Sequence, residues 1–163
     1  MKELTQVRDA VISALTAAGV PAFAAFPAEE ARRYEAAVAA VDVGTVQGTV
    51  LGFCNYLGQT RDKTGAVYEV YGKQLEAEVT VEIRAGRAAD CQSGCETAAD
   101  VLLGGLPSGV RPAELAWEAL QWERETELFL RRCRLRCRAL FTAQAEEEGQ
   151  VFLDFVLKGV LTT

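Results

Sequence analysis

The chain has 163 residues, half of them hydrophobic, and a formal net charge of −6 from 17 lysines and arginines against 23 aspartates and glutamates. A length of about 100–200 residues is typical of one domain, so we predict a single domain over residues 1–163, and the apolar content excludes a disordered chain. The sequence contains no histidine, which excludes a Ser-His-Asp triad, a Cys-His dyad and a histidine-ligated zinc site, and its acidic balance argues against a broad phosphate-binding face.

An amphipathic helix is predicted at the start of the chain, over Leu4–Ala18. Its apolar side chains recur at three- and four-residue steps: Leu4, Val7, Val11, Leu15 and Ala18. Gly19 and Pro21 then end the helix. Because polar residues interrupt this segment and no apolar run approaches the ~20 residues of a membrane span, we expect no secretion signal, no membrane contact and a cytoplasmic location.

Strands are predicted in the next third of the chain. Three short segments are rich in small or β-branched apolar residues: Ala22–Phe26, Ala36–Val43 and Val46–Phe53. A polar, irregular loop is predicted over Gly58–Lys73, with Val67–Tyr71 as one arm of a projecting hairpin, and a long loop of this kind is commonly functional. The clearest strand is Leu75–Ile83, in which apolar residues alternate with polar ones.

A second helix and further strands are predicted in the last part of the chain. The helix begins with Asp90 as its cap, runs to about Leu103, and carries an apolar stripe of Cys91, Cys95, Ala98, Ala99 and Leu102. The strands are Val110–Trp117, in which Pro112 favours a sheet edge, Leu128–Phe141 and Val151–Leu161. Runs of strands broken by two helices indicate the α+β class: a mixed, mainly antiparallel sheet with both helices packed on one face.

Arginines alternate with apolar residues in the segment Leu128–Phe141. As a strand it would present Arg132, Arg134, Arg136 and Arg138 on one face and Cys133, Leu135, Cys137, Ala139 and Phe141 on the other. This arginine ladder could dock an acidic partner or a nucleic-acid backbone. We favour the alternative that it faces the glutamate ladder of the Leu75–Ile83 strand, because opposite charges on neighbouring strands are favourable. The two strands would then be neighbours, within one subunit or across an interface, through Glu76, Glu78 and Glu82.

Other motifs indicate no cofactor, metal or catalysis. Both cysteine pairs are typical of buried thiols. Cys133 and Cys137, four apart on a strand, would lie ~13 Å from each other and could not share one ion. Cys91 and Cys95 share a face of the predicted helix, but that face is its apolar one. The glycines at positions 44, 48 and 52 lack the Gly-Lys-Ser/Thr ending of a phosphate loop. Trp117 and Trp122 could anchor an interface, but a tryptophan at the end of a strand is more often simply half buried. We therefore expect a protein that is not an enzyme.

The order of these elements resembles the tail terminator, or tail-completion, proteins of tailed bacteriophages, prophages and phage-tail-like bacteriocins. The resemblance covers nearly the whole chain and is one of order and spacing. It is carried by the first helix leading into Val20–Pro27, Arg32-Arg33-Tyr34 before an apolar strand, a loop from Tyr56-Leu57-Gly58 to Tyr71-Gly72, the strand Leu75–Ile83, a second helix, and the ending Phe152–Gly159.

This resemblance implies an assembly protein. Such proteins form hexameric rings at the head-proximal end of the tail, where they stop tube and sheath polymerisation and join the head connector, while DNA passes through the ring as cargo. They act in the bacterial host cytoplasm during assembly and then stay in the virion or tail particle. The two ladders, Glu76, Glu78, Glu82, Arg132, Arg134, Arg136 and Arg138, suit a subunit interface in a ring. The residues expected to contact the tube or connector are Arg61, Asp62, Lys63, Tyr68 and Tyr71.

Two alternatives remain open from the sequence. The first is another head–tail connector or a head-closure protein. The second is a small cytoplasmic enzyme that uses aspartate and glutamate with a metal, although no carboxylate pair stands out in a recognisable setting.

Overall fold

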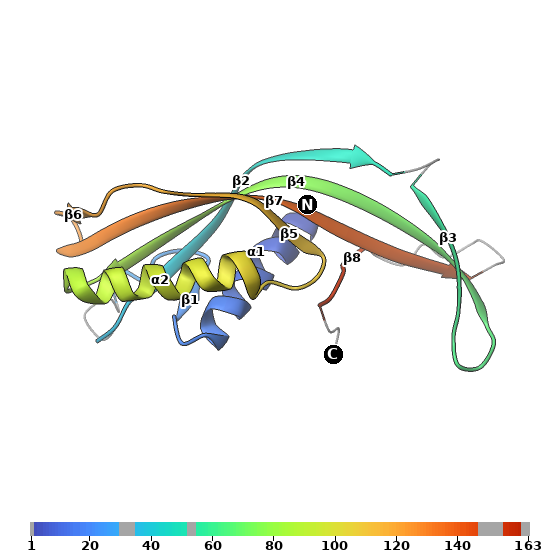
Figure 1. Ribbon diagram of the computed structural model, residues 1–163, viewed down its shortest axis with the longest axis horizontal. Coiled ribbons are helices and arrows are strands. Elements are labelled where there is room, and N and C mark those ends of the chain that lie inside the picture. The colour runs from blue at the N-terminus through green and yellow to red at the C-terminus, as the bar shows by residue number, and fades with distance from the viewer. Residues whose placement is uncertain (1, 30–34, 52–54, 147–154, 161–163) are drawn as a thin grey trace.

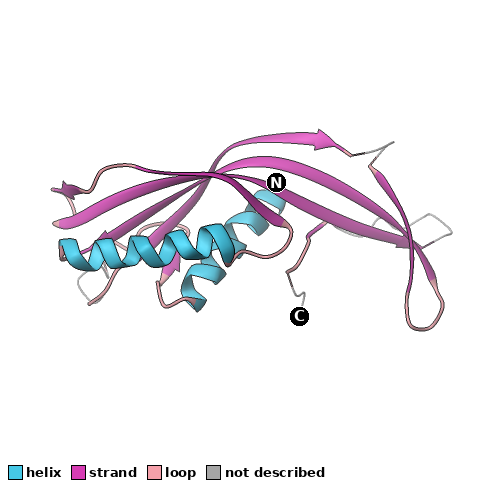
Figure 2. Cartoon of the chain, viewed as in Figure 1, coloured by secondary structure: helices cyan, strands magenta, loops and turns pink. Residues whose placement is uncertain are grey.

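The computed structural model describes residues 2–29, 35–51, 55–146 and 155–160 (Figure 1). Its elements in chain order are α1 (Lys2–Ala17), β1 (Ala22–Phe23), β2 (Val38–Val50), β3 (Tyr56–Arg61), β4 (Val67–Ala85), α2 (Ala88–Gly104), β5 (Val110–Trp117), β6 (Gln121–Glu123), β7 (Leu128–Glu146) and β8 (Val156–Leu157). The α+β class predicted from the sequence is confirmed, because the two helices cover one face of a mixed, mainly antiparallel sheet (Figure 2).

All strands of the described residues belong to one eight-stranded sheet. Its main path is β1-β2-β4-β7-β5, with β3 paired to β4 and with β6 and β8 paired to β7. Only the short pair β1–β2 is parallel. The strands β4 and β7 form its centre and pair along their whole lengths, from Tyr68 opposite Glu146 to Ala85 opposite Phe129.

The core lies between the helices and one face of the sheet. Alternation along β4 and β7 turns Val79, Val81 and Leu135 toward the helices, where none of the three side chains is exposed. The helix α1 adds the apolar stripe predicted from the sequence, of which Val7, Val11 and Leu15 are fully buried. Burial of each such side chain contributes about 1.5–3 kcal/mol. The opposite face, which we call the open face, has no helix among the described residues (Figure 2).

Several predicted boundaries are wrong. The two strands predicted over residues 36–53 are one strand, β2, whose register shifts between Val43 and Val46 in a bulge. The segment Gly58–Lys73 is not the irregular loop that was predicted, but the projecting hairpin expected there is confirmed, because β3 pairs with the first part of β4, which contains Val67–Tyr71. Asp90 does not cap α2: the cap position is Arg87, in an extended conformation without a side-chain cap, and Asp90 lies in the first turn.

The two short strands also differ from the predictions. The strand predicted over Ala22–Phe26 is only Ala22–Phe23 in β1. Of the strand predicted over Val151–Leu161, the described residues form β8 at Val156–Leu157 only, and residues 151–154 and 161 lie outside the described ranges. The strand β5 has the predicted bounds, Val110–Trp117, and lies at an edge of the main path, as Pro112 indicated.

The central strands are much longer than the helices that cover them. The 19 residues of β4 or β7 span about 63 Å at ~3.3 Å per residue, whereas the 17 residues of α2 span about 26 Å at ~1.5 Å per residue. The sheet therefore projects beyond the helices (Figure 1). We call this projection the arm; it consists of β3, residues 67–72 of β4 and residues 142–146 of β7.

Candidate functional site: the open face and the arm

The two predicted ladders lie side by side on the open face. In the β4–β7 register Glu76 is opposite Arg138, Glu78 is opposite Arg136, and Glu82 is opposite Arg132. The expectation that these strands are neighbours is therefore confirmed, and the pairing lies within one chain. A role of the same residues in a contact between subunits stays a prediction.

Each arginine of the ladder has a carboxylate partner in its own chain. Two use the predicted glutamates: Arg132 Nη2 lies 2.6 Å from Glu82 Oε1 and Arg138 Nε lies 3.1 Å from Glu76 Oε1. The other two turn away from β4, so that Arg134 pairs with Glu118 at 2.9 Å and Arg136 with Glu114 at 3.2 Å. Among the described residues Glu78 makes no ion pair.

Sequence reasoning missed Glu114 and Glu118 as partners of the ladder. Glu114 lies in the predicted strand Val110–Trp117, but its position opposite Arg136 depends on the pairing of β5 with β7 and on a register shift after Pro112. Glu118 follows that strand and accepts hydrogen bonds from two arginines, Arg132 and Arg134. One signal could have found them: Glu114 and Glu118 are four residues apart in and directly after the predicted edge strand Val110–Trp117, and even spacing on a strand places both on one face.

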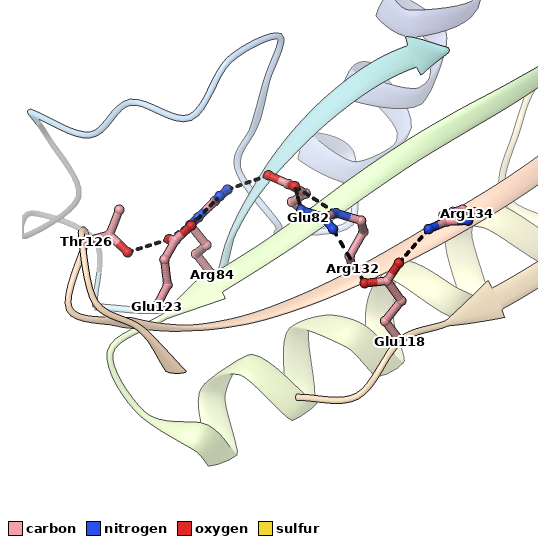
Figure 3. A network of polar contacts seen from close by, with 7 residues as sticks. All are labelled: Glu82, Arg84, Glu118, Glu123, Thr126, Arg132 and Arg134. Atoms are coloured by element: carbon pink, nitrogen blue, oxygen red, sulfur yellow. Dashed lines mark hydrogen bonds and ion pairs between the residues drawn. The ribbon is translucent and has the colours of Figure 1, made fainter. Parts of the chain in front are cut away.

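The ladder continues into a charged network at the end of the sheet where β6 lies. Arg84 Nε donates to Glu123 Oε2 at 2.8 Å and Arg84 Nη2 donates to Glu123 Oε1 at 3.1 Å, while Arg84 Nη1 lies 2.9 Å from Glu82 Oε2 without hydrogen-bond geometry. Figure 3 shows the resulting chain of alternating groups: Thr126, Glu123, Arg84, Glu82, Arg132, Glu118 and Arg134. No pattern in the sequence points to Arg84 or Glu123 as site residues.

Arg84 is the one charged residue among those that the structure describes as buried, with 8% of its surface exposed. Burial by itself would lower the pKa of Arg84, but the hydrogen bond to Glu123 and the charges of Glu82 and Glu123 raise it above the ordinary value, so the side chain is charged. The hydrogen bond from Arg84 also lowers the pKa of Glu123. The guanidinium carbon lies 4.5 Å from the centre of the Phe26 ring, which adds a cation–π contact.

The arginine ladder of the open face is balanced by carboxylates of the same chain. A phosphate that bound the arginine ladder would have to displace carboxylates that already neutralise it. The open face has a shallow hollow of about 530 Å³, whose lining includes Glu78, Glu114 and Arg136. Within the described ranges no group of three or more cysteines, aspartates or glutamates is placed to hold a metal ion.

The five residues predicted to contact the tube or connector all lie on the arm or in its turn. Asp62 builds the turn: its Oδ1 accepts hydrogen bonds from Thr64 N at 2.8 Å, Thr64 Oγ1 at 2.6 Å and Ala66 N at 3.0 Å, and the bond from the Thr64 hydroxyl is the main cause of its lowered pKa. Arg61 and Lys63 are exposed beside it.

Two tyrosines stiffen the arm. The Tyr71 hydroxyl donates to Glu69 at 3.0 Å, which raises the pKa of Tyr71, and its ring lies edge-to-face with Tyr56 at 5.6 Å. The Tyr68 hydroxyl donates to Asp62 at 3.3 Å. Contact of this arm with a tube or connector stays a prediction.

Four cysteines are buried free thiols, as the sequence indicated: Cys91, Cys95, Cys133 and Cys137. Burial raises the pKa of Cys133 to about 12 and that of Cys137 to about 11, so both thiols are protonated at neutral pH. The fifth, Cys54, lies outside the described residues.

No helix in the described part of the chain is long and apolar enough to cross a membrane. No protein-family model matches the sequence, and no curated protein matches it. Among solved structures, the chain is distantly similar to a chain of the virion of a native gene transfer agent particle, with a TM-score of 0.25 and 20% sequence identity. The similarity covers 62% of this chain, which spans 66% of the length of that neighbour.

Proposed function

We propose that this chain is a structural assembly protein that forms a ring at the head-proximal end of a phage or phage-like tail. There it ends polymerisation of the tail tube, and of the sheath where one is present, and joins the tail to the head connector. The proposal starts from the resemblance in element order to tail terminator proteins. Two surfaces described above, the open face and the arm, support the proposal because both could contact neighbouring proteins.

The observation that carries the proposal is the arm, which extends beyond the described helices. A sheet is stable when each apolar face packs against another layer, but strands of about 63 Å extend beyond a helix of about 26 Å. The arm is a three-stranded projection with exposed side chains along β3. Such a projection is suited to reach a neighbouring protein.

The charge of the open face fits a ring through which DNA passes. Proteins hold DNA mainly by neutralising its phosphates with free lysines and arginines. In this chain the four ladder arginines are neutralised by Glu76, Glu82, Glu114 and Glu118, and the whole chain is acidic. DNA would therefore slide past this protein without being retained. The protein would act in the host cytoplasm during assembly and remain in the finished particle, without catalysis or a cofactor.

The mass of the purified protein tests this proposal. Size-exclusion chromatography with light scattering should detect six copies of the 17.6 kDa chain, about 106 kDa, at high protein concentration. The same sample should show no retention of double-stranded DNA in a gel-shift measurement at physiological salt, because the four ladder arginines are already paired and the chain as a whole is acidic. A chain that stays monomeric at every concentration, or that binds DNA tightly, would contradict the proposed role.

A further inference from the structure

Exposed apolar side chains gather at the two opposite ends of the molecule. Among the described residues, large apolar side chains are exposed at Val50, Tyr56, Leu57, Leu103, Leu120, Trp122 and Val160. Three of them lie where β2 leads into β3, and we call Val50, Tyr56 and Leu57 the arm patch. Two lie at or beside β6, and we call Leu120 and Trp122 the β6 patch. Strands β3 and β6 lie toward opposite ends of the long axis (Figure 1).

The arm patch is exposed and held in place. Val50 is 69% exposed, Leu57 is 47% exposed and Tyr56 is 40% exposed. The Tyr56 ring packs edge-to-face against Tyr71. Leu57 lies over Gly72, where any Cβ would collide with it. The patch therefore presents a fixed apolar surface, and ordering it on binding has a low entropic cost.

The β6 patch has the same construction. Trp122 is 52% exposed, and its ring packs edge-to-face against Phe129 with the ring centres 5.0 Å apart. Leu120 beside it is 38% exposed. Tryptophan and tyrosine are the residue types that most often dominate binding energy at protein interfaces. Each end of the molecule therefore holds one exposed aromatic anchor supported by a second ring.

The charges beside the two patches are complementary. At the arm the exposed Arg61 and Lys63 make no ion pair with any described residue, and together they outnumber the one carboxylate between them, Asp62, which accepts hydrogen bonds within its own turn. Next to the β6 patch, the turn between β6 and β7 exposes two acidic residues, Glu125 and Glu127, and one basic residue, Arg124, which precedes them. A basic tip at one end and an acidic turn at the other favour contact between the two ends.

We infer that the arm patch of one copy docks on the β6 patch of the next copy. Such a contact joins two different surfaces, so it repeats head to tail and makes a closed ring when the rotation between copies closes. A twofold contact of either patch with itself would bring like charges together. The inference rests on the proposed ring for closure, and it names the surfaces through which the copies meet.

Two variants, each broken at one end, test the inference. Leu57→Glu removes the arm patch and Trp122→Ser removes the β6 patch, while Leu103→Glu, at a 57% exposed site on α2, is the matched control. Each patch variant alone should associate at least about tenfold more weakly than the wild-type chain, the loss expected of an interface anchor. Circular dichroism should show that all three fold.

The decisive step is to mix the two patch variants in equal amounts. In a head-to-tail contact the mixture retains one intact interface, from the arm patch of the Trp122→Ser chain to the β6 patch of the Leu57→Glu chain, so a 1:1 dimer should form and grow no further. The head-to-tail contact is overturned if both variants form rings like the wild-type chain, which leaves the proposed ring standing, or if the mixture stays monomeric. A wild-type chain that does not self-associate overturns both.

Discussion

Among the ion pairs of the charged network, loss of a partner of Arg84 would lower the stability of the fold most. It is nearly buried, and two glutamates and the Phe26 ring surround its guanidinium. A buried charge is costly without partners, so Glu82 and Glu123 are needed for Arg84 to remain in the fold. The outer pairs of the same ladder, such as Arg136–Glu114, are exposed on both sides and contribute little.

Stability should depend on pH through Glu123. Its pKa in the folded chain is lowered below the ordinary 4.5, chiefly by the hydrogen bond from Arg84. A lowered carboxyl pKa contributes stability that is fully present above the unfolded pKa and is lost as the pH falls through the folded pKa. Glu123→Gln should therefore lower the melting temperature at pH 7, and the difference from the wild-type chain should shrink below pH 4.5. A difference that is constant from pH 7 to pH 3 would contradict this origin.

Gly94 marks the closest approach of α2 to the sheet. A Cβ at this position would collide with the Cβ of Ala37 and lie 3.2 Å from Ile83 Cγ2. Gly94→Ala should therefore destabilise the chain by about 1–3 kcal/mol, although alanine gains up to ~1 kcal/mol of helix propensity over glycine.

Gly104, at the end of the same helix, is the control, because a Cβ there meets nothing within 4 Å. Gly104→Ala should leave the stability unchanged or slightly higher. Chemical denaturation of both variants measures the two effects, and equal stabilities would show that α2 can move away from the sheet at no cost.

At the level of elements, periodicity predicted the features that have one apolar face. The stripe of α1, the bounds of β5 and the two faces of β7 follow from spacing alone. Of the hairpin in the arm, the strand at Val67–Tyr71 was predicted, but β3 was not, because the residues of β3 are polar or exposed on both sides and show no alternation. The division of β2 into two strands was wrong because a bulge near Gly44 interrupts the pattern without ending the strand.

The candidate site was only half predictable for a related reason. Alternation places the arginines and glutamates on one face, but the actual partner of each arginine depends on which strand lies on each side of β7. The central position of β7, between β4 and β5, brings Glu114 and Glu118 to Arg136 and Arg134. That arrangement is a property of the folded sheet and has no local signal.

The two pairs between β4 and β7 should differ in strength. The side chains of Arg132 and Glu82 are 34% and 23% exposed and share two hydrogen bonds, whereas those of Arg138 and Glu76 are 62% and 43% exposed and share one. Double-mutant cycles with alanine should give a coupling energy of about 1–2 kcal/mol for the first pair and below ~0.5 kcal/mol for the second. Equal couplings would mean that burial does not decide the strength of this ladder.

On the scale of the whole molecule, the sheet separates three tasks. One face of the sheet packs against the helices to form the core, and the open face carries a charge-balanced ladder. The arm extends beyond the helices (Figure 1). The large apolar side chains that remain exposed among the described residues lie mainly at the two ends of the molecule. Exposed apolar surface at both ends is expected of a subunit that contacts one neighbour at each end of its long axis.

Electron microscopy of the purified chain tests the central claim, that this protein is a ring-forming subunit of a tail, most directly. Class averages of negatively stained particles should show rings with sixfold symmetry and a central opening wide enough for a DNA duplex. Compact particles without an opening, or twofold dimers at every concentration, would contradict the claim.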